Sequence, residues 1–317
     1  MKPLIPHVPH DVLASELTRD KFIRNTNYGK NEIYIVTHHN SPNVVKEIGR
    51  LRELTFRVAG GGTGKPLDLD EFDTCEKPYK QLIVWNPDDK QIVGSYRFIR
   101  CRNAMIKNDI LQLATVELFH FSNRFIKDYL PYTIELGRSF VQPDYQPSSE
   151  NRKGLFSLDN LWDGLGALVV DNPDMKYLFG KVTMYRDFDI KARDMILYFM
   201  KRYFPDKDNL VTPIDPIELS YDMRQFGKAL EGKDYKDGHA LLNQLVREAG
   251  ENIPPLINSY MNLSSTMKTF GTSLNPEFGD VEETGIMVTI ADIYDTKKER
   301  HIDSYIKEKS GLRRRPD

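Results

Sequence analysis

The spacing of apolar residues along the chain predicts alternating helices and strands. Between residues 42 and 58, apolar side chains recur every three or four positions, at Val44, Val45, Ile48 and Leu51, and this is the period of a helix with one buried face. Helices are also predicted at 155–171 and 189–204. Short runs rich in β-branched and aromatic residues predict strands at 33–38, 80–85, 91–99, 134–141, 177–184 and 285–293, with a further apolar stretch at 115–121.

This order of elements is typical of a layered α/β protein, an α+β arrangement of a mixed sheet and helices. The turn-forming cluster at 86–89 predicts that strands 80–85 and 91–99 form an antiparallel hairpin. Because helix 155–171 connects strands 134–141 and 177–184, we expect these two strands to be parallel neighbours.

The chain changes character after residue 204. Prolines cluster at 205, 213 and 216, and a charged helical stretch then runs to about residue 250. We therefore expect a core over 1–204, a helical insertion over 205–255, and a segment over 256–317 that returns a strand to the core and ends in a charged tail.

Composition narrows the class of protein. Of 317 residues, 28% are charged and 40% are hydrophobic, which indicates a globular chain and not a disordered one. The formal net charge of −2 gives no reason to expect a nucleic-acid partner. Two cysteines form no disulfide framework, and no stretch approaches the ~18 apolar residues of a membrane-spanning helix. We expect a cytoplasmic protein, with peripheral contact to the inner face of the membrane as an open alternative.

Three common kinds of site are disfavoured by the sequence. Residues 59–66 approach a phosphate-binding loop, but Pro66 stands where a magnesium-coordinating Ser or Thr is needed, so a glycine-rich flexible loop is the simpler interpretation. No Gly-x-Ser-x-Gly hydrolase motif occurs. His38 and His39 are adjacent in a predicted strand and would point to opposite faces, so we expect no metal site.

Charged residues interrupt several apolar elements. Arg97 lies within one predicted strand, and Glu135 and Arg138 lie three apart within another, on opposite faces unless a bulge intervenes. Arg52 and Phe56 share a helical face with Ile48. Buried charges are costly when unpaired, so these residues should form an ion-pair network. Spacing alone leaves open whether this network holds the fold together or forms a functional site.

Taken together, these motifs resemble the autoinducer-synthase branch of the GNAT superfamily, and more closely the ornithine-lipid and glycine-lipid N-acyltransferase family, whose members are also labelled hemolysins. The string Glu135-Leu136-Gly137-Arg138-Ser139, followed by Val141, Pro143 and Tyr145, is the most recognisable part of the resemblance. Segments 252–267 and 285–293 extend it over nearly the whole chain. The other matching motifs are Arg52-x-x-x-Phe56, Asp70-x-x-Asp73 and Gly94-Ser95-Tyr96-Arg97.

The resemblance implies a GNAT-like mixed sheet in which strands 134–141 and 177–184 splay apart. It also implies transfer of a long fatty or hydroxy-fatty acyl chain to the amine of an amino acid, glycine or ornithine, in aminolipid synthesis. The GNAT pyrophosphate loop is missing after Tyr145, so acyl-carrier protein is favoured over coenzyme A as the carrier of the acyl thioester. No cofactor is implied beyond this co-substrate.

The resemblance also suggests roles for individual residues. Glu135 would act as a general base, through a water molecule, on the attacking amine. Arg138, Arg97 and Arg52 would bind the acceptor carboxylate or the acidic donor, because guanidinium groups match carboxylate geometry. The remaining expected substrate-binding residues orient these arginines, line the site or surround the thioester oxygen: Phe56, Asp70, Asp73, Ser139, Phe140 and Val141.

Two alternatives to a lipid-forming enzyme stay open at this point. One is a related enzyme that makes a small acylated signal, and the other is a non-catalytic module that binds acyl-carrier protein or membrane. Helix 189–204 combines apolar residues with Lys191, Arg193, Lys201 and Arg202. It could therefore contact an anionic surface, although a helix packed against the core is the simpler interpretation.

Overall fold

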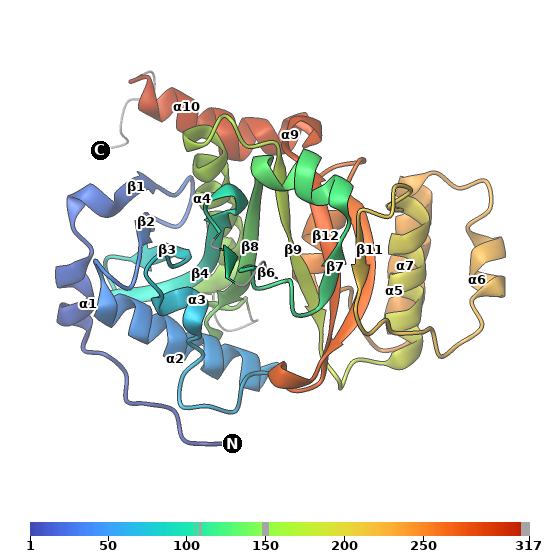
Figure 1. Cartoon of the computed structure of the whole chain (residues 1–317), viewed down its shortest axis with the longest axis horizontal. Helices are drawn as coiled ribbons and strands as arrows, with labels where there is room; N and C mark the ends of the chain where they lie inside the picture. Colours follow the sequence, from blue (N-terminus) through green and yellow to red (C-terminus); the bar gives the residue numbers. More distant parts are fainter. Residues whose placement is uncertain (105, 108–109, 148–151, 312–317) are drawn as a thin grey trace.

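The computed structural model describes residues 1–104, 106–107, 110–147 and 152–311. At its centre these residues form an eight-stranded sheet in the order β1-β2-β3-β4-β8-β9-β12-β11 (Figure 1). Neighbouring strands are antiparallel except for β8 and β9, which are parallel. The strands of this sheet are β1 (Phe22–Asn25), β2 (Glu32–Val36), β3 (Lys80–Asn86), β4 (Gln91–Arg100), β8 (Thr133–Val141), β9 (Tyr177–Met184), β11 (Lys268–Asn275) and β12 (Val281–Thr289).

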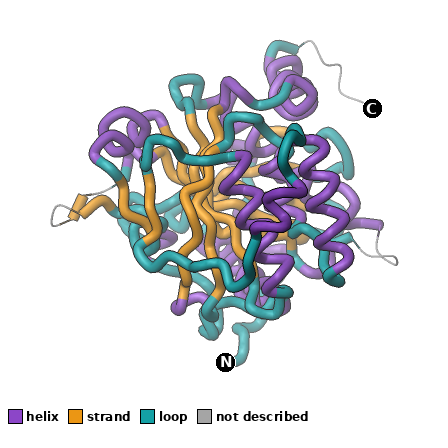
Figure 2. The backbone as a smooth tube through the Cα atoms, turned by 90° about the vertical axis from the view of Figure 1, so that its right-hand side faces the viewer, coloured by secondary structure: helices purple, strands orange, loops and turns teal. Residues whose placement is uncertain are grey.

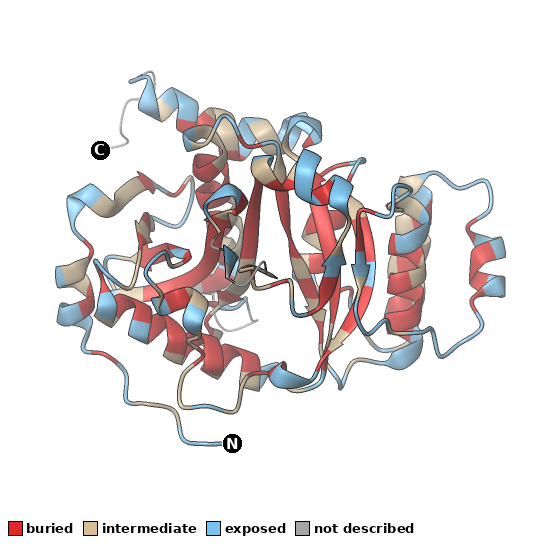
Figure 3. Ribbon diagram, in the orientation of Figure 1, coloured by how far each residue is buried: buried red, intermediate tan, exposed pale blue. Residues whose placement is uncertain are grey.

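Helices cover both faces of the twisted sheet (Figure 2). Successive residues of β3 point to opposite faces, so Ile83 packs with α2 while Leu82 packs with α4. Buried residues line the sheet and the sheet-facing sides of these helices (Figure 3). The α-helices are α1 (His10–Glu16), α2 (Pro42–Val58), α3 (Glu71–Thr74), α4 (Ser157–Asp171), α5 (Ile190–Tyr203), α6 (Arg224–Ala229), α7 (Tyr235–Glu248), α8 (Pro255–Met261), α9 (Asp295–Lys297) and α10 (Ser304–Lys309).

The main predictions about the elements are confirmed. The predicted helix over 42–58 is α2, and the hairpin is formed by β3 and β4. β8 and β9 are parallel neighbours joined through α4. The predicted mixed α/β sheet flanked by helices is therefore the observed fold class.

Several strands differ from the prediction, and β1 of the main sheet was not predicted. In the apolar stretch 115–121 only β7 (Phe119–Phe121) is a strand, and it pairs with β10 (Val211–Pro213) outside the main sheet. β11 was not predicted, because its sequence KTFGTSLN is mostly polar and small. It nevertheless forms the edge of the sheet, where a strand needs few apolar side chains. A further short hairpin joins β5 (Ile106–Lys107) to β6 (Ile110–Leu111).

The helix predicted at 189–204 packs into the core. In α5, Met195, Ile196, Phe199 and Met200 are buried in the largest hydrophobic cluster, together with Leu242 of α7. The apolar face of α5 is therefore covered by protein. The expected insertion over 205–255 contains α6 and α7, and its division from the rest of the chain stays a prediction. Residues 312–317 of the expected charged tail lie outside the described residues.

β8 and β9 separate half-way along their length. They pair only from Thr133 with Tyr177 to Leu136 with Gly180. Beyond this point β8 bulges against β4, because Arg97 pairs with Gly137 and Ser95 with Phe140, which leaves Arg138 and Ser139 opposite a single residue. Arg138 has a positive φ of 48°. The predicted splay is therefore confirmed, and the bulge is its visible cause.

Gly94 of β4 pairs with Val141, just beyond this bulge. A Cβ atom at position 94 would come within 2.5 Å of the Phe140 carbonyl oxygen, so a side chain would push β4 away from β8. Glycine here permits the close approach on which the geometry of the bulge depends.

None of the helices formed by the described residues is both long and apolar enough to cross a lipid bilayer.

Candidate active site

A buried network of ion pairs joins α2, α3 and β4. Arg52 is completely buried, and its Nη1 lies 3.0 Å from Asp73 Oδ2 while its Nη2 donates to Gln81 Oε1 at 2.6 Å. Arg97 Nη1 lies 2.7 Å from Asp70 Oδ2 and 3.2 Å from Asp73 Oδ2. Burial alone would raise the pKa of Asp73, but the guanidinium groups of Arg52 and Arg97 outweigh it and hold this pKa below its usual range.

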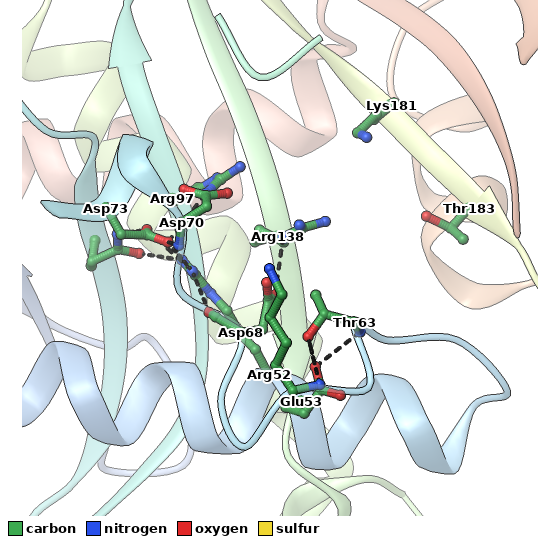
Figure 4. Close-up of polar contacts among 12 residues, drawn as sticks. Arg52, Glu53, Thr63, Asp68, Asp70, Asp73, Arg97, Arg138, Lys181 and Thr183 are labelled. Atoms are coloured by element: carbon green, nitrogen blue, oxygen red, sulfur yellow. Dashed lines mark hydrogen bonds and ion pairs between the residues drawn. The ribbon is translucent and has the colours of Figure 1, made fainter. Parts of the chain in front are cut away.

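The structure thus brings four of the predicted residues together (Figure 4). These residues differ in how accessible they are to a substrate. Arg52 has no exposed surface, so it holds α2 to α3 and cannot touch a substrate. Arg97 and Asp70 line a cavity described below and are open to a small ligand.

Arg138 forms a second ion pair nearby. Its Nε lies 3.0 Å from Asp68 Oδ2, and its guanidinium carbon lies 4.2 Å from the centre of the Phe278 ring. Burial raises the pKa of the Asp68 carboxyl, and Arg138 opposes this effect. Among the described residues, neither Nη of Arg138 has a hydrogen-bond partner, so this side chain keeps donors for a ligand.

Glu135 is placed differently from the expectation that it faces the acceptor amine. Its side chain is 1% exposed, and Glu135 Oε1 accepts from Thr115 N at 3.1 Å and from Thr115 Oγ1 at 2.6 Å. Its Oε2 accepts from the Tyr79 hydroxyl. Glu135 is not among the described residues that line either cavity of the site. This geometry favours a role in holding β8 to neighbouring segments, and its catalytic role stays a prediction.

A mainly apolar cavity of about 480 Å³ opens in the splay between β8 and β9. It contains the predicted substrate-binding residues Phe56, Ser139, Phe140 and Val141. Because β8 does not pair with β9 beyond Leu136, backbone groups on this edge of β8 are free of sheet partners on that side. Such groups are suited to meet a thioester oxygen. Other apolar walls come from both helix layers: Ala59, Pro147, Leu158, Tyr185, Pro254, Pro255, Leu256 and Phe278.

A second, polar cavity of about 240 Å³ adjoins the first. Both cavities are lined by Arg138, Lys181 and Phe278, which therefore form the wall between them. Arg138 and Lys181 point into the space between their strands (Figure 4). The polar cavity is otherwise lined mainly by charged and polar side chains: Thr63, Lys65, Asp68, Asp70, Glu71, Arg97, Gln112, Glu117, Asn275 and Glu277.

Sequence reasoning missed an ion pair at this junction. Lys181 of β9 pairs with Glu283 of β12, and both line the apolar cavity beside Thr183 and Tyr185. Burial and the nearby Glu283 carboxylate raise the pKa of Tyr185 to about 12. Lys181 stands as a charge within the predicted apolar strand 177–184, and this is the signal that selected Arg97. Glu283 precedes the predicted strand 285–293 and lies in β12 only because this strand begins earlier, at Val281. Neither residue belongs to the motifs that carry the family resemblance, so neither was selected as a site residue.

The glycine-rich loop is hydrogen-bonded to α2. Glu53 of α2 accepts hydrogen bonds from Thr63 N at 3.0 Å, Thr63 Oγ1 at 2.7 Å and Gly64 N at 2.7 Å. This carboxylate ties the loop to the helix, and the flexibility of the loop stays a prediction. The same contacts occupy amide groups that a phosphate would need, which is a physical reason against nucleotide binding here.

One group of described residues has metal-like geometry, away from both cavities. Asp159, Asp163 and His301 offer ligand atoms within 4.8 Å of one another. However, Asp163 Oδ1 already contacts His301 Nδ1 at 2.8 Å, its Oδ2 accepts from Asn27 N, and Arg300 pairs with Asp159. These contacts account for the group as a link between α4 and the C-terminal helices.

Comparisons with known proteins agree on an acyltransferase. Residues 51–152 match the family model of the acetyltransferase (GNAT) domain, a range that contains every site residue selected from the sequence. The chain is 50% identical over 309 residues to a glycine N(alpha)-acyltransferase of Phocaeicola vulgatus, covering 97% of this chain and 95% of the relative. It is 52% identical over 307 residues to a glycine N(alpha)-acyltransferase of Bacteroides thetaiotaomicron, covering 96% and 91%.

Among solved structures, the chain aligns with a CoA-dependent acyl-homoserine lactone synthase, BjaI, with MTA. It aligns with a TM-score of 0.36 and 11% identity, over 89% of this chain and 90% of that chain. The AHL synthase LasI aligns with a TM-score of 0.30 and 13% identity, over 53% of this chain and 77% of that chain.

Proposed function

This chain belongs to the glycine N-acyltransferase family and contains a GNAT domain, so it is an N-acyltransferase, and we propose that it moves a long fatty acyl chain from an acyl-carrier-protein thioester to the amino group of glycine. Membership of this family of enzymes excludes the non-catalytic module considered above. The observation that carries the proposal is the pair of adjoining cavities, one apolar and one charged, that meet where β8 and β9 separate.

The apolar cavity supports a long hydrocarbon substrate. Its walls are mainly aliphatic and aromatic, and its volume of about 480 Å³ lies within the ~300–1,000 Å³ range of ligand pockets. A thioester whose acyl chain lies against Leu158 and Leu256 has its carbonyl group beside Phe140 and Val141 of β8. Unpaired backbone N–H groups on this edge would then stabilise the oxygen as negative charge develops on it.

The polar cavity supports an amino-acid acceptor. The free terminal nitrogens of Arg138 suit a carboxylate, to which a guanidinium group can donate two parallel hydrogen bonds. An amino acid bound there by its carboxylate has its amine directed towards the apolar cavity. Glycine, which lacks a side chain, fits a cavity of about 240 Å³ that already holds several charged groups.

Acyl-carrier protein is the proposed carrier because the chain lacks the usual GNAT pyrophosphate loop after Tyr145. Residues 148–151 of this segment lie outside the described residues. The glycine-rich loop at 60–64 does not replace it, since Glu53 occupies its amides. The product, a long-chain N-acylglycine, is an amphiphile with a carboxylate head group, which is consistent with a role in aminolipid synthesis.

The proposal is tested by incubating the purified chain with isotopically labelled glycine and a long-chain acyl-carrier-protein thioester. We expect N-acylglycine by mass spectrometry, with one free thiol released per molecule formed. The same assay with acyl-CoA and with ornithine tests the donor and the acceptor separately. If neither donor yields N-acylglycine, the proposed function is contradicted. A preference for acyl-CoA would contradict only the proposal that acyl-carrier protein is the carrier.

A further inference from the structure

Glu283 is the one carboxylate among the described residues of the apolar cavity. In the register of β12 and β9, Glu283 lies opposite Thr183, and Gly285 lies opposite Lys181. Side chains at these positions therefore share one face of the sheet with Tyr185, the residue that follows the end of β9. Glu283 is 2% exposed, and it is nevertheless among the residues that line the cavity assigned to the reacting groups.

The partners of Glu283 leave it room to accept a proton. Glu283 pairs with Lys181, and the Thr183 hydroxyl is 3.4 Å from its Oε1, a long contact. An ionised carboxylate offers about four acceptor positions, so this group keeps unused capacity toward the cavity. Glu135, by contrast, receives three hydrogen bonds and does not line the cavity. The Lys181 ammonium is the partner that a buried, ionised carboxylate needs.

Building on the proposed function, we infer that Glu283 is the proton acceptor of the acyl transfer. Glycine enters as an ammonium ion, which cannot attack a carbonyl group. Glu283 takes one proton from it and so frees the nitrogen lone pair. The nitrogen then forms a bond to the thioester carbon, the C–S bond breaks, and a second proton passes from nitrogen to the departing thiolate. Glu283 finally returns its proton to solvent, so that one amide, one thiol and one released proton balance the reaction.

The geometry also explains why the acceptor amine reaches this carboxylate. Arg138 and Lys181 stand in the wall shared by the two cavities, and Lys181 bridges that wall to Glu283. A carboxylate held by Arg138 on one side of the wall leaves the amine on the side of Glu283. The titratable and charged groups that face this position are Lys181, Tyr185 and Arg138.

The experiment compares Glu283→Gln with wild type, measuring kcat and KM for glycine at saturating acyl-carrier-protein thioester across pH. Loss of a general base should lower kcat by about 10²–10⁴-fold near neutral pH. The loss should shrink as pH rises, because more glycine is then already a free amine, while KM changes little. Glu283→Asp, which keeps a carboxylate, should recover part of the rate. Glu282→Gln is the matched control. Glu282 is the neighbour of Glu283 in the chain, but its side chain pairs with Arg193 and does not line the cavity.

Several outcomes would overturn the inference. These are an unchanged kcat in Glu283→Gln, a rise in KM alone, or a rate loss that is the same at every pH. If Glu283→Gln does not fold because Lys181 is left unpaired, the double variant Lys181→Gln/Glu283→Gln removes both charges and must show the same pH-dependent loss. Failure of wild type to acylate glycine would instead contradict the proposed function and is read from the same assay.

Discussion

The guanidinium carbon of Arg138 lies 4.2 Å from the centre of the Phe278 ring. This contact joins the β8 bulge to the turn before β12, and it fixes a charged group in the wall between the two cavities. The Arg138 backbone has a positive φ, a conformation that non-glycine residues rarely adopt. Stacking on Phe278 and pairing with Asp68 are the interactions that hold it there.

The first prediction concerns Arg138 as the anchor of the acceptor carboxylate. Arg138→Lys keeps the positive charge but loses the planar pair of donors, so kcat/KM for glycine should fall by about tenfold or more, as expected for a hydrogen bond to a charged group worth about 1.5–3 kcal/mol. Glycinamide, which lacks a carboxylate, should be used poorly by wild type and almost equally poorly by the variant. An equal loss with both acceptors would show that Arg138 acts on folding or on the donor.

The second prediction concerns Arg97. Arg97→Ala leaves the buried Asp73 with one guanidinium partner in place of two, and removing one member of a buried pair costs about 3–5 kcal/mol of unfolding free energy. Urea denaturation near pH 7 measures this loss. Arg100→Ala is the control: its ion pair with Asp174 is partly exposed to solvent, with side chains 31% and 45% exposed, so its cost should stay within about 1 kcal/mol.

The same residue pair gives a pH dependence with a definite sign. The pKa of Asp73 is lowered in the folded protein, so its contribution to stability is present above the unfolded pKa of about 3.9 and is lost as pH falls below it. The acid-side slope of unfolding free energy should therefore be shallower in Arg97→Ala than in wild type. Parallel curves below pH ~4 would contradict the assignment of Asp73 as the paired group.

Most of the fold follows from local patterns in the sequence. The helical period of α2 and the β-branched runs of β3, β4 and β9 are strong because each packs an apolar face on the sheet. β11 carries no such pattern, since an edge strand needs few apolar residues. The sequence left open whether β8 has a bulge at Arg138. The bulge depends on Gly94 permitting the close approach of a strand that is distant in sequence.

The site was predictable only in part, for a related reason. Charges inside apolar strands selected Arg97, Glu135 and Arg138, and the structure joins Arg97 to Asp70 and Asp73. The positions of charged residues within apolar strands do not show which face of the sheet becomes a cavity wall. The pattern therefore selected Glu135 as a catalytic base although Thr115 and Tyr79 enclose it, and it did not select Glu283, which is distant in sequence.

The third prediction tests the apolar cavity as the site of the acyl chain. Leu158→Trp adds bulk to the wall that α4 contributes, so kcat/KM for a long-chain donor should fall by at least ~10-fold, the lower end of the range for a misfit of a single methylene group. A short-chain donor should be affected much less. Leu155→Trp is the matched control, because Leu155 is 65% exposed and is not among the residues lining the cavity. An equal loss for both chain lengths would place the acyl chain elsewhere.

The last prediction separates the two candidate bases through Glu135. Glu135→Gln keeps one acceptor oxygen for Thr115 but replaces the oxygen that Tyr79 donates to, so unfolding free energy should fall by about 1–3 kcal/mol. Burial raises the pKa of the Glu135 carboxyl in the folded protein, despite its hydrogen bonds with Thr115 and Tyr79. Its contribution to stability is therefore full below the unfolded pKa of about 4.3 and is lost as pH rises through the higher folded value.

Since glutamine does not titrate, the stability difference between wild type and Glu135→Gln should shrink as pH rises above about 4.3. Turnover of the folded variant should fall far less than the ~10²–10⁴-fold expected of a lost general base, and by a factor that does not depend on pH. Denaturation curves and acylation rates from one preparation, measured across the same pH series, test both statements. A stable Glu135→Gln whose large rate loss diminishes with rising pH would make Glu135 the base, and would assign to Glu283 only the pairing of Lys181.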